Sequence, residues 1–198
     1  DIDLLGFGNN DPNELLLVFK SIVRVAIEEP DGVVFTIDTF KSALIKEGEH
    51  YQGVRITGQA KLDTAKVSVQ IDIGFGDAVT PDASEACLPS LLGMPEAQLR
   101  VYPVYTVIAE KFQAMVMLGI ANSRMKDFYD IKTIASTMQL DGQILFDAIK
   151  ATFERRKTDI TTETLYVFSD EFRHDKNKQI QWAAFLNKNS LETETNFS

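Results

Sequence analysis

The chain has 198 residues, of which 44% are hydrophobic, enough for one ordinary domain or two small ones with a sizeable core. The 20 basic and 29 acidic side chains give a net charge of -9, which excludes electrostatic nucleic-acid binding by the protein as a whole. The one cysteine, Cys87, allows no internal disulfide and no cysteine-based metal site. No apolar run approaches the roughly 20 residues that cross a bilayer. We therefore expect a cytoplasmic protein with no membrane partner.

The chain begins with DIDLLGFG, in which two aspartates, Asp1 and Asp3, alternate with apolar residues. This alternation predicts a strand over residues 1–7 with one polar and one apolar face. Because the chain starts abruptly on this pattern without an initiator methionine, we expect that the N-terminal part of its core is missing.

The next segment, DPNELLLVFKSIVRVAIEE, predicts a helix of about 16 residues, with Asp11 as N-cap and Pro12 at the first helical position. Three segments rich in β-branched residues then predict strands: GVVFTID, YQGVRITGQAKL and KVSVQIDIGF. Since only the polar stretch DTA separates the last two, we predict a hairpin.

Residues 81–103 contain four of the six prolines and are interpreted as the join between two halves. Beyond Thr106 apolar residues recur three and four apart, which predicts helices in the following segments: TVIAEKFQAMVMLGI, KDFYDIKTIAST, GQILFDAIKATFERR and DKNKQIQWAAFLNK. The predicted fold class is α+β, with an α/β core over residues 1–103 and a helical subdomain over residues 104–198.

Asp1 and Asp3 are the first candidates for chemistry. Residues i and i+2 of a strand share a face, so the two carboxylates are held close together and repel unless a cation lies between them. Mg²⁺ suits this arrangement, because it takes one or two carboxylates and fills its other positions with water and phosphate oxygens. A D-x-D pair also occurs by chance in exposed strands.

Asp72 lies in the middle of a predicted strand, on the face opposite to Val67, Val69 and Ile71. A third acid on the sheet is what a site for two metal ions requires. The alternative, an exposed aspartate on the solvent face of a hairpin, is about equally probable.

Lys111 lies at the border of the apolar stripe of its helix, where it can hold an ammonium group against a triphosphate or simply extend into solvent. In the following RMKDFYDI, Ser123 is a candidate cap, and Asp127 and Asp130 lie one turn apart on the same face. The cations that could pair with these acids are Lys111, Arg124 and Lys126. Either the carboxylate pair orients Lys111 or activates a nucleophile, or it forms only an ordinary Lys126–Asp130 pair.

Other kinds of site have little support. His50 and His174 are far apart, and the sequence has no nucleophile elbow, no Walker A loop and no dinucleotide-binding fingerprint. The basic stretches 150–157 and 173–178 could contact phosphates, although solvated helix faces are the simpler interpretation. Trp182 and Phe185 have the spacing of core residues.

Taken in order, several segments resemble the AbiEii-like nucleotidyltransferase toxins of type IV toxin–antitoxin and abortive-infection systems. The segments that carry this resemblance are DIDLLGFG, VQIDIGFGDAV, VYPVYTVIAEKFQAMVMLG, NSRMKDFYDI, AIKATFERR and QWAAFL. The resemblance extends to about Leu186 and is most specific from AEKFQAMV through KDFYD.

The resemblance implies a polymerase-β-like core with a mixed sheet, followed by a helical C-terminal subdomain. It implies that a nucleoside monophosphate is transferred from a nucleoside triphosphate to an acceptor such as the 3′ end of tRNA, and that a cognate antitoxin exists. Under it, the metal ligands for Mg²⁺ are Asp1, Asp3 and Asp72, the nucleotide-binding residues are Lys111, Arg124 and Lys126, and the catalytic residues are Asp1, Asp3, Lys111, Asp127 and Asp130.

The sequence departs from the family at one point. The first motif of the family also contains a glycine-serine or glycine-glycine pair and an arginine upstream of D-x-D, and these residues do not occur here. Activity therefore depends on a part of the triphosphate site that this sequence does not supply. The rival hypothesis is a non-catalytic module with the same fold that binds RNA or a partner protein through its C-terminal basic stretches.

Overall fold

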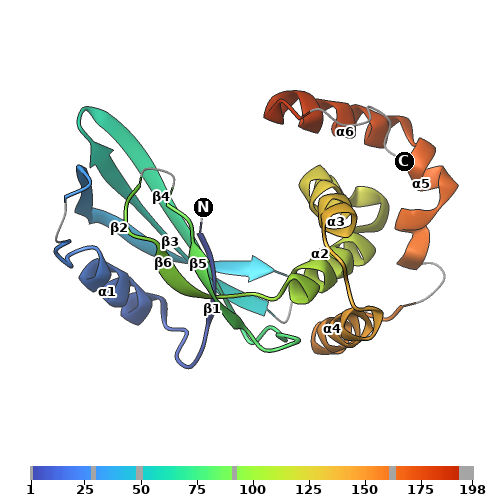
Figure 1. Cartoon of the computed structure of the whole chain (residues 1–198), viewed down its shortest axis with the longest axis horizontal. Helices are drawn as coiled ribbons and strands as arrows, with labels where there is room; N and C mark the ends of the chain where they lie inside the picture. The colour runs from blue at the N-terminus through green and yellow to red at the C-terminus, as the bar shows by residue number, and fades with distance from the viewer. Residues whose placement is uncertain (1, 28–29, 48–50, 91–92, 161–163, 192–198) are drawn as a thin grey trace. The chain divides into compact units, whose positions relative to one another are not determined.

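The computed structural model describes residues 2–27, 30–47, 51–90, 93–160 and 164–191. By contact, the chain divides into two compact units, Asp1–Asp77 and Ala78–Ser198. The first unit holds a mixed four-stranded sheet and one helix, and the second holds a two-stranded sheet and the remaining helices (Figure 1). The predicted α+β class with a mixed sheet is confirmed.

The boundary between the two units differs from the boundary predicted between the two domains. Residues 78–103, which we assigned to the α/β core, group by contact with the helices. The division into domains over residues 1–103 and 104–198 therefore stays a prediction.

The four-stranded sheet has the order β1-β4-β3-β2, in which β1 is parallel to β4 and the other neighbours are antiparallel. Its strands are β1 (Ile2–Gly6), β2 (Val33–Glu47), β3 (Tyr51–Leu62) and β4 (Ala65–Phe75). The predicted hairpin is confirmed as β3 and β4. Its turn consists of Asp63 and Thr64, and Asp63 has a φ of 52°, in the left-handed region that aspartate tolerates better than most residues.

Helix α1 (Pro12–Ile22) begins as predicted. The Asp11 side chain accepts hydrogen bonds from the backbone N–H groups of Asn13 and Glu14, both at 2.9 Å. The helix has 11 residues and ends before the predicted length is reached. Its end coincides with the β-branched residues Ile22, Val23 and Val25, which lose side-chain freedom inside a helix.

Helix α1 packs against one face of the sheet. On that face Val54, Ile56, Ile71 and Ile73 are buried together with Phe40, and Leu15, Leu16, Phe19 and Val23 cover them. Phe40 lies within an irregularity in the pairing of β2, between Thr36 and Lys41, and its ring lies over Gly58. A Cβ atom at Gly58 would lie 2.6 Å from this ring, so only glycine fits there.

Two short strands occur where we predicted only an irregular join. Strands β5 (Ser84–Leu88) and β6 (Ala97–Val101) pair antiparallel. The prolines between them, Pro89 and Pro95, lie in the connection, where no ladder hydrogen bond is lost. The proline-rich segment therefore forms a hairpin with an irregular loop.

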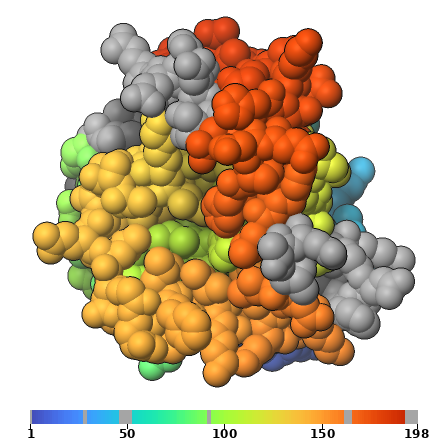
Figure 2. Space-filling model, turned by 90° about the vertical axis from the view of Figure 1, so that its right-hand side faces the viewer, coloured from blue at the N-terminus to red at the C-terminus, as the bar shows by residue number. Residues whose placement is uncertain are grey.

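The four predicted helices are present as α2 (Val104–Leu118), α3 (Met125–Thr137), α4 (Gly142–Arg155) and α6 (Lys176–Asn189). Three short elements were not predicted: η1 (Gly119–Ala121), η2 (Thr164–Phe168) and α5 (Asp170–His174). In Figure 2 the later helices overlie α2, and only a strip of α2 is visible between them.

Aromatic side chains hold α3 on two sides. Phe128 packs on one cluster formed by Met115, Val167 and Phe172, with its ring centroid 5.8 Å from that of Phe172. It also packs on a second cluster formed by Met125, Trp182 and Leu186. The predicted core role of Trp182 is confirmed, because only 2% of it is exposed.

Among the described residues, one stretch, Val104–Ala121, is long and apolar enough to cross a membrane by length and composition alone. Its mean hydropathy is 1.3, although Glu110 and Lys111 interrupt it. A third of this stretch is buried. The buried side chains of α2 are Thr106, Ile108, Ala109, Gln113, Met115 and Val116. This burial is typical of a core helix, here of the second unit.

Candidate functional site

Three charged residues form a row across neighbouring strands of the four-stranded sheet. Asp3 of β1 pairs in register with Asp72 of β4, and Asp72 pairs with Arg55 of β3. Paired residues of adjacent strands lie on the same face, and the flanking residues Ile71 and Ile73 are buried on the other face, against α1. The row therefore lies on the face opposite to α1.

Arg55 binds the carboxylate of Asp72 through two nitrogens of its guanidinium group. Its Nε donates to Oδ1 of Asp72 at 2.7 Å and a terminal nitrogen donates to Oδ2 at 2.6 Å. This is the bidentate geometry that makes arginine–carboxylate pairs strong. The hydrogen bonds and charge of Arg55 hold the pKa of Asp72 below its usual value, against the opposing effect of burial.

We did not predict a role for Arg55, although the sequence holds the signal that would have shown it. The two-residue turn fixes the pairing of β3 with β4 and brings Arg55 opposite Asp72. A three-residue connection, as DTA suggests, would place Ile56 opposite Asp72 instead. The exact length of the turn therefore decides which residue of β3 pairs with Asp72.

The acidic residues of the sheet fit a magnesium site in part. Asp3 and Asp72 offer two carboxylates on one face of adjacent strands, which are the hard oxygen ligands that Mg²⁺ prefers. Asp1 lies outside the described residues. Within those residues, no three acidic, histidine or cysteine side chains gather as a metal cluster. The described residues thus offer a metal ion two carboxylates, one of which already binds an arginine.

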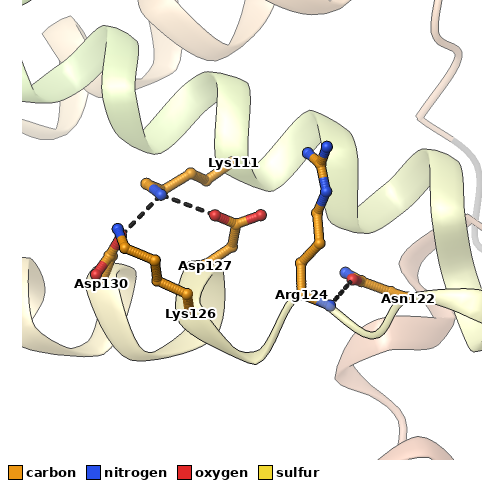
Figure 3. A network of polar contacts seen from close by, with 6 residues as sticks. All are labelled: Lys111, Asn122, Arg124, Lys126, Asp127 and Asp130. Carbon is orange, nitrogen blue, oxygen red and sulfur yellow. Dashed lines mark hydrogen bonds and ion pairs between the residues drawn. The ribbon is translucent and has the colours of Figure 1, made fainter. Parts of the chain in front are cut away.

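The second unit brings Lys111 between two carboxylates of another helix (Figure 3). Its Nζ lies 2.8 Å from Oδ1 of Asp127 and 2.8 Å from Oδ2 of Asp130. All three side chains are at most 24% exposed. The same oxygen of Asp130 also binds Lys126 at 2.7 Å, so the ordinary pair along α3 exists together with the pairs to Lys111.

These contacts stabilise the charged forms of Lys111 and Asp130. Burial alone would lower the pKa of Lys111, but hydrogen bonds and charges of Asp127 and Asp130 outweigh it and raise this pKa. Burial would raise the pKa of Asp130, but Lys111 and Lys126 together lower it below its usual value. At neutral pH the cluster therefore holds a protonated lysine and an ionised Asp130.

The start of α3 is fixed by Asn122, and the predicted cap at Ser123 is wrong. The Oδ1 atom of Asn122 accepts a hydrogen bond from the backbone N–H of Arg124 at 2.8 Å (Figure 3). The carbonyl oxygen of Asn122 accepts another from Nζ of Lys178 at 2.6 Å. Asn122 is fully buried and Lys178 is 3% exposed, so this contact ties α6 to the start of α3.

A hollow of about 560 Å³ lies beside the first turn of α3 and along α6. Its basic lining residues are Arg124, Lys126 and Lys188, against one acid, Asp127. Phe185 and Gln181 of α6 complete the far wall. The hollow therefore presents positive charge next to the Lys111 cluster.

Three cations of the basic stretches 150–157 and 173–178 have acidic or polar neighbours. Arg156 donates to Oε1 of Gln113 at 3.0 Å and lies 3.8 Å from Glu110, both on α2. Lys150 and Arg173 have acidic neighbours on their own helices, at 3.9 and 3.5 Å. Arg155, Lys157 and Lys176 of the same stretches are exposed, so contact of these stretches with phosphates stays a prediction.

The predicted site residues thus fall into two groups. Asp3 and Asp72 come together on the sheet of the first unit, and Arg55 joins them. Lys111, Lys126, Asp127 and Asp130 come together in the second unit, and Arg124 lies at the start of the same helix.

A family model described as "Nucleotidyl transferase AbiEii toxin, Type IV TA system" matches residues 1–197. No curated protein and no solved structure matches the chain.

Proposed function

Because the chain belongs to the AbiEii family of nucleotidyltransferase toxins of type IV toxin–antitoxin systems, we propose that it transfers a nucleoside monophosphate from a nucleoside triphosphate to RNA. The family implies nucleotide transfer and a cognate antitoxin in general terms. We propose further that the acceptor is the 3′ end of tRNA, that the reaction takes place in the cytoplasm, and that the sheet is a polymerase-β-like core.

The observation that carries this proposal is the pairing of Lys111 with Asp127 and Asp130. A lysine ammonium has three N–H donors, and the two aspartates accept two of them. Within the part of the chain that the structure describes, one donor remains for a phosphate oxygen, in an orientation that the aspartates fix. Most of the rate enhancement in phosphoryl transfer comes from positioning and charge neutralisation, which such a preorganised cation supplies.

The two aspartates differ in the number of ion pairs that they make. Asp130 binds both Lys111 and Lys126, and these cations lower its pKa and make it a weak base. Asp127 makes a single ion pair within the described part of the chain. We assign to Asp130 the positioning of Lys111 and to Asp127 the acceptance of the proton from the attacking hydroxyl.

Arg124 and Lys126 supply further positive charge to the phosphates from the rim of the hollow. Asp3 and Asp72, with Asp1, are the residues that would hold Mg²⁺. When bound, this ion supplies charge neutralisation at the triphosphate and at the pyrophosphate that leaves. The chain itself contributes the carboxylates and their alignment across β1 and β4.

The proposal is tested by incubating the protein with Mg²⁺, each of the four α-labelled nucleoside triphosphates and total RNA. We expect label in RNA from the parent, and a loss of roughly 100-fold or more for Asp3→Asn and for Asp127→Asn. Asp147→Asn, an exposed aspartate of α4, is the matched control and should transfer at the parental rate.

Two results would contradict the proposal: no labelled RNA with any nucleotide, or parental rates for both site variants. If Arg124→Gln and Lys188→Gln abolish RNA binding while Asp3 and Asp127 are dispensable, the chain is the non-catalytic binding module. The hollow that these two cations line favours this second candidate.

A further inference from the structure

The carboxylate of Asp72 is occupied by Arg55 in a way that bears directly on cation binding. Both of its oxygens accept hydrogen bonds from the guanidinium group, at 2.7 and 2.6 Å. Oδ2 accepts a further, longer bond of 3.4 Å from Gln70. The lone pairs of an ionised carboxylate that would point at a metal ion are thus partly engaged.

Asp72 lies between two groups of opposite charge. On one side the register brings Asp3 of β1, and on the other Arg55 of β3. Without a cation, two neighbouring carboxylates on one face repel, and the guanidinium group compensates for part of that repulsion. A divalent cation between Asp3 and Asp72 would take over this compensation and would repel the guanidinium group.

Arg55 is the more exposed partner of this ion pair. Its side chain is 42% exposed, whereas that of Asp72 is 24% exposed. A long, half-exposed arginine side chain can turn toward water more readily than the short carboxylate, whose place is fixed within β4. The partner that moves when a competing cation arrives is therefore Arg55.

We propose that Arg55 is the exchangeable counter-ion of Asp72: it holds the carboxylate in place beside Asp3 and releases it when a divalent cation binds to both aspartates. The proposal rests on the assignment of Asp3 and Asp72 as metal ligands. Arg55 is thereby a positioning residue of the metal site that sets how tightly the site takes its ion.

Direct metal binding tests the exchange without any nucleotidyl transfer. Free Mn²⁺ is measured by electron paramagnetic resonance during titration of the parent, of Arg55→Gln and of Lys61→Gln, an exposed lysine of the same strand. We expect Arg55→Gln to bind Mn²⁺ about tenfold more tightly than the parent, because one competing positive charge is gone. Lys61→Gln should bind like the parent, and Asp3→Asn should bind far more weakly.

A second measurement follows the arginine itself. The ¹H–¹⁵N signal of Arg55 Nε, identified by its absence from the spectrum of Arg55→Lys, is followed during a Mg²⁺ titration. We expect it to shift or broaden in a saturable way, with the dissociation constant of the Mg²⁺ site. In Asp3→Asn it should stay unchanged over the same concentrations.

Three outcomes overturn the proposal: weaker Mn²⁺ binding by Arg55→Gln than by the parent, an unchanged Nε signal while metal binds, or no Mn²⁺ binding by either protein. Weaker binding would mean that Arg55 only orients Asp72. Exchange without nucleotidyl transfer would refute the proposed function and leave the role of Arg55 standing.

Discussion

Lys111 is the residue on which the polar cluster of the helical unit depends. It is the cation that two carboxylates of α3 share, both at 2.8 Å, and all three side chains are largely covered. Removing the shared cation leaves Asp127 without its ion pair and Asp130 with Lys126 alone, one helical turn apart in a partly buried place. Removing Lys126, which is 71% exposed, removes only a solvated pair.

This difference predicts unequal costs for the two lysines. Lys111→Met should lower the free energy of unfolding by about 2–3 kcal/mol, because it leaves the partly buried charge of Asp127 without its cation. Lys126→Ala should lower it by about 0.5 kcal/mol or less. Urea denaturation measures both values.

In a Lys111→Met background, the pair Asp127→Asn and Asp130→Asn should restore part of the lost stability, since the repulsion is removed. Equal costs for Lys111→Met and Lys126→Ala would show that the buried pairs add nothing beyond a surface ion pair.

The pKa of Asp130 predicts how stability depends on pH. Its folded-state pKa is lowered, so its contribution to stability is present above the unfolded-state pKa of about 4 and is lost as pH falls through the folded value. Asp130→Asn should therefore lower Tm at pH 7, and the difference from the parent should shrink below about pH 4. Thermal unfolding at several pH values measures it.

For Lys111 the dependence on pH has the opposite sign. Its folded-state pKa is raised, so its contribution to stability is present below the unfolded-state pKa of about 10.4 and is lost as pH rises through the folded value. The exposed Asp147→Asn is the control and should show the parental profile throughout. A Tm difference for Asp130→Asn that does not change between pH 7 and pH 3 would argue against an ionic role of Asp130.

At the scale of elements, the start of α3 is where the second unit determines the position of its candidate site. Asp127 belongs to the first turn of α3, and that turn begins where Asn122 binds the backbone of Arg124. Asn122 is in turn held from α6 by Lys178. Two segments far apart in the chain, residues 122–127 and α6, therefore fix the position of one carboxylate.

Asn122→Ala and Ser123→Ala should separate these effects, because the two residues are neighbours and the Asn122 side chain binds the backbone of Arg124 just before α3. We expect Asn122→Ala to cost about 1–2 kcal/mol in stability, by loss of this hydrogen bond of a buried side chain. Ser123→Ala should stay within about 0.5 kcal/mol of the parent, since Ser123 does not cap α3. Chemical denaturation checks both, and a larger cost for Ser123→Ala would reverse the assignment.

At the scale of the whole molecule, the net charge of -9 limits how RNA can be bound. Long-range attraction to phosphates is excluded, so affinity must come from a few local cations. The lining of the hollow offers three: Arg124, Lys126 and Lys188.

The salt dependence of RNA binding should reflect this small number. For single-stranded RNA we expect log Kd to rise with log salt concentration with a slope of about 2, since each phosphate contact contributes about 0.7. Lys188→Gln should reduce the slope by about 0.7, whereas Lys157→Gln at the end of α4 should not change it. Fluorescence anisotropy in 50–200 mM KCl measures the slopes, and a parental slope for Lys188→Gln would exclude the hollow as the binding surface.

Local signals in the sequence predicted much of the fold. The cap at Asp11, the β3–β4 hairpin and the four long helices follow from caps, β-branched runs and helical spacing, and each of them is present. The strands β5 and β6 did not follow, because their pairing depends on contacts across a proline-rich loop. The apolar run after Ser21 suggested a longer α1, but apolar spacing does not show where β-branched residues end a helix.

The part of the candidate site that lies on a single helix could be predicted from the sequence, and the contacts between helices could not. The spacing of Asp127 and Asp130 on one helix suggested a shared cation, and Lys111 was among the candidates. That both acids bind Lys111 is a tertiary contact between α2 and α3, which spacing alone cannot show. The cap at Asn122 depends equally on burial beneath α6, which no local pattern reveals.

Phe128 packs against both aromatic clusters of the second unit, and this affects how the unit unfolds locally. It follows Asp127 directly and contributes its ring to both aromatic clusters, one toward α2 and α5 and one toward α6. Neither cluster can loosen without disturbing the other. Slowly exchanging amide hydrogens of α2, α3 and α6 should therefore exchange in a single cooperative event.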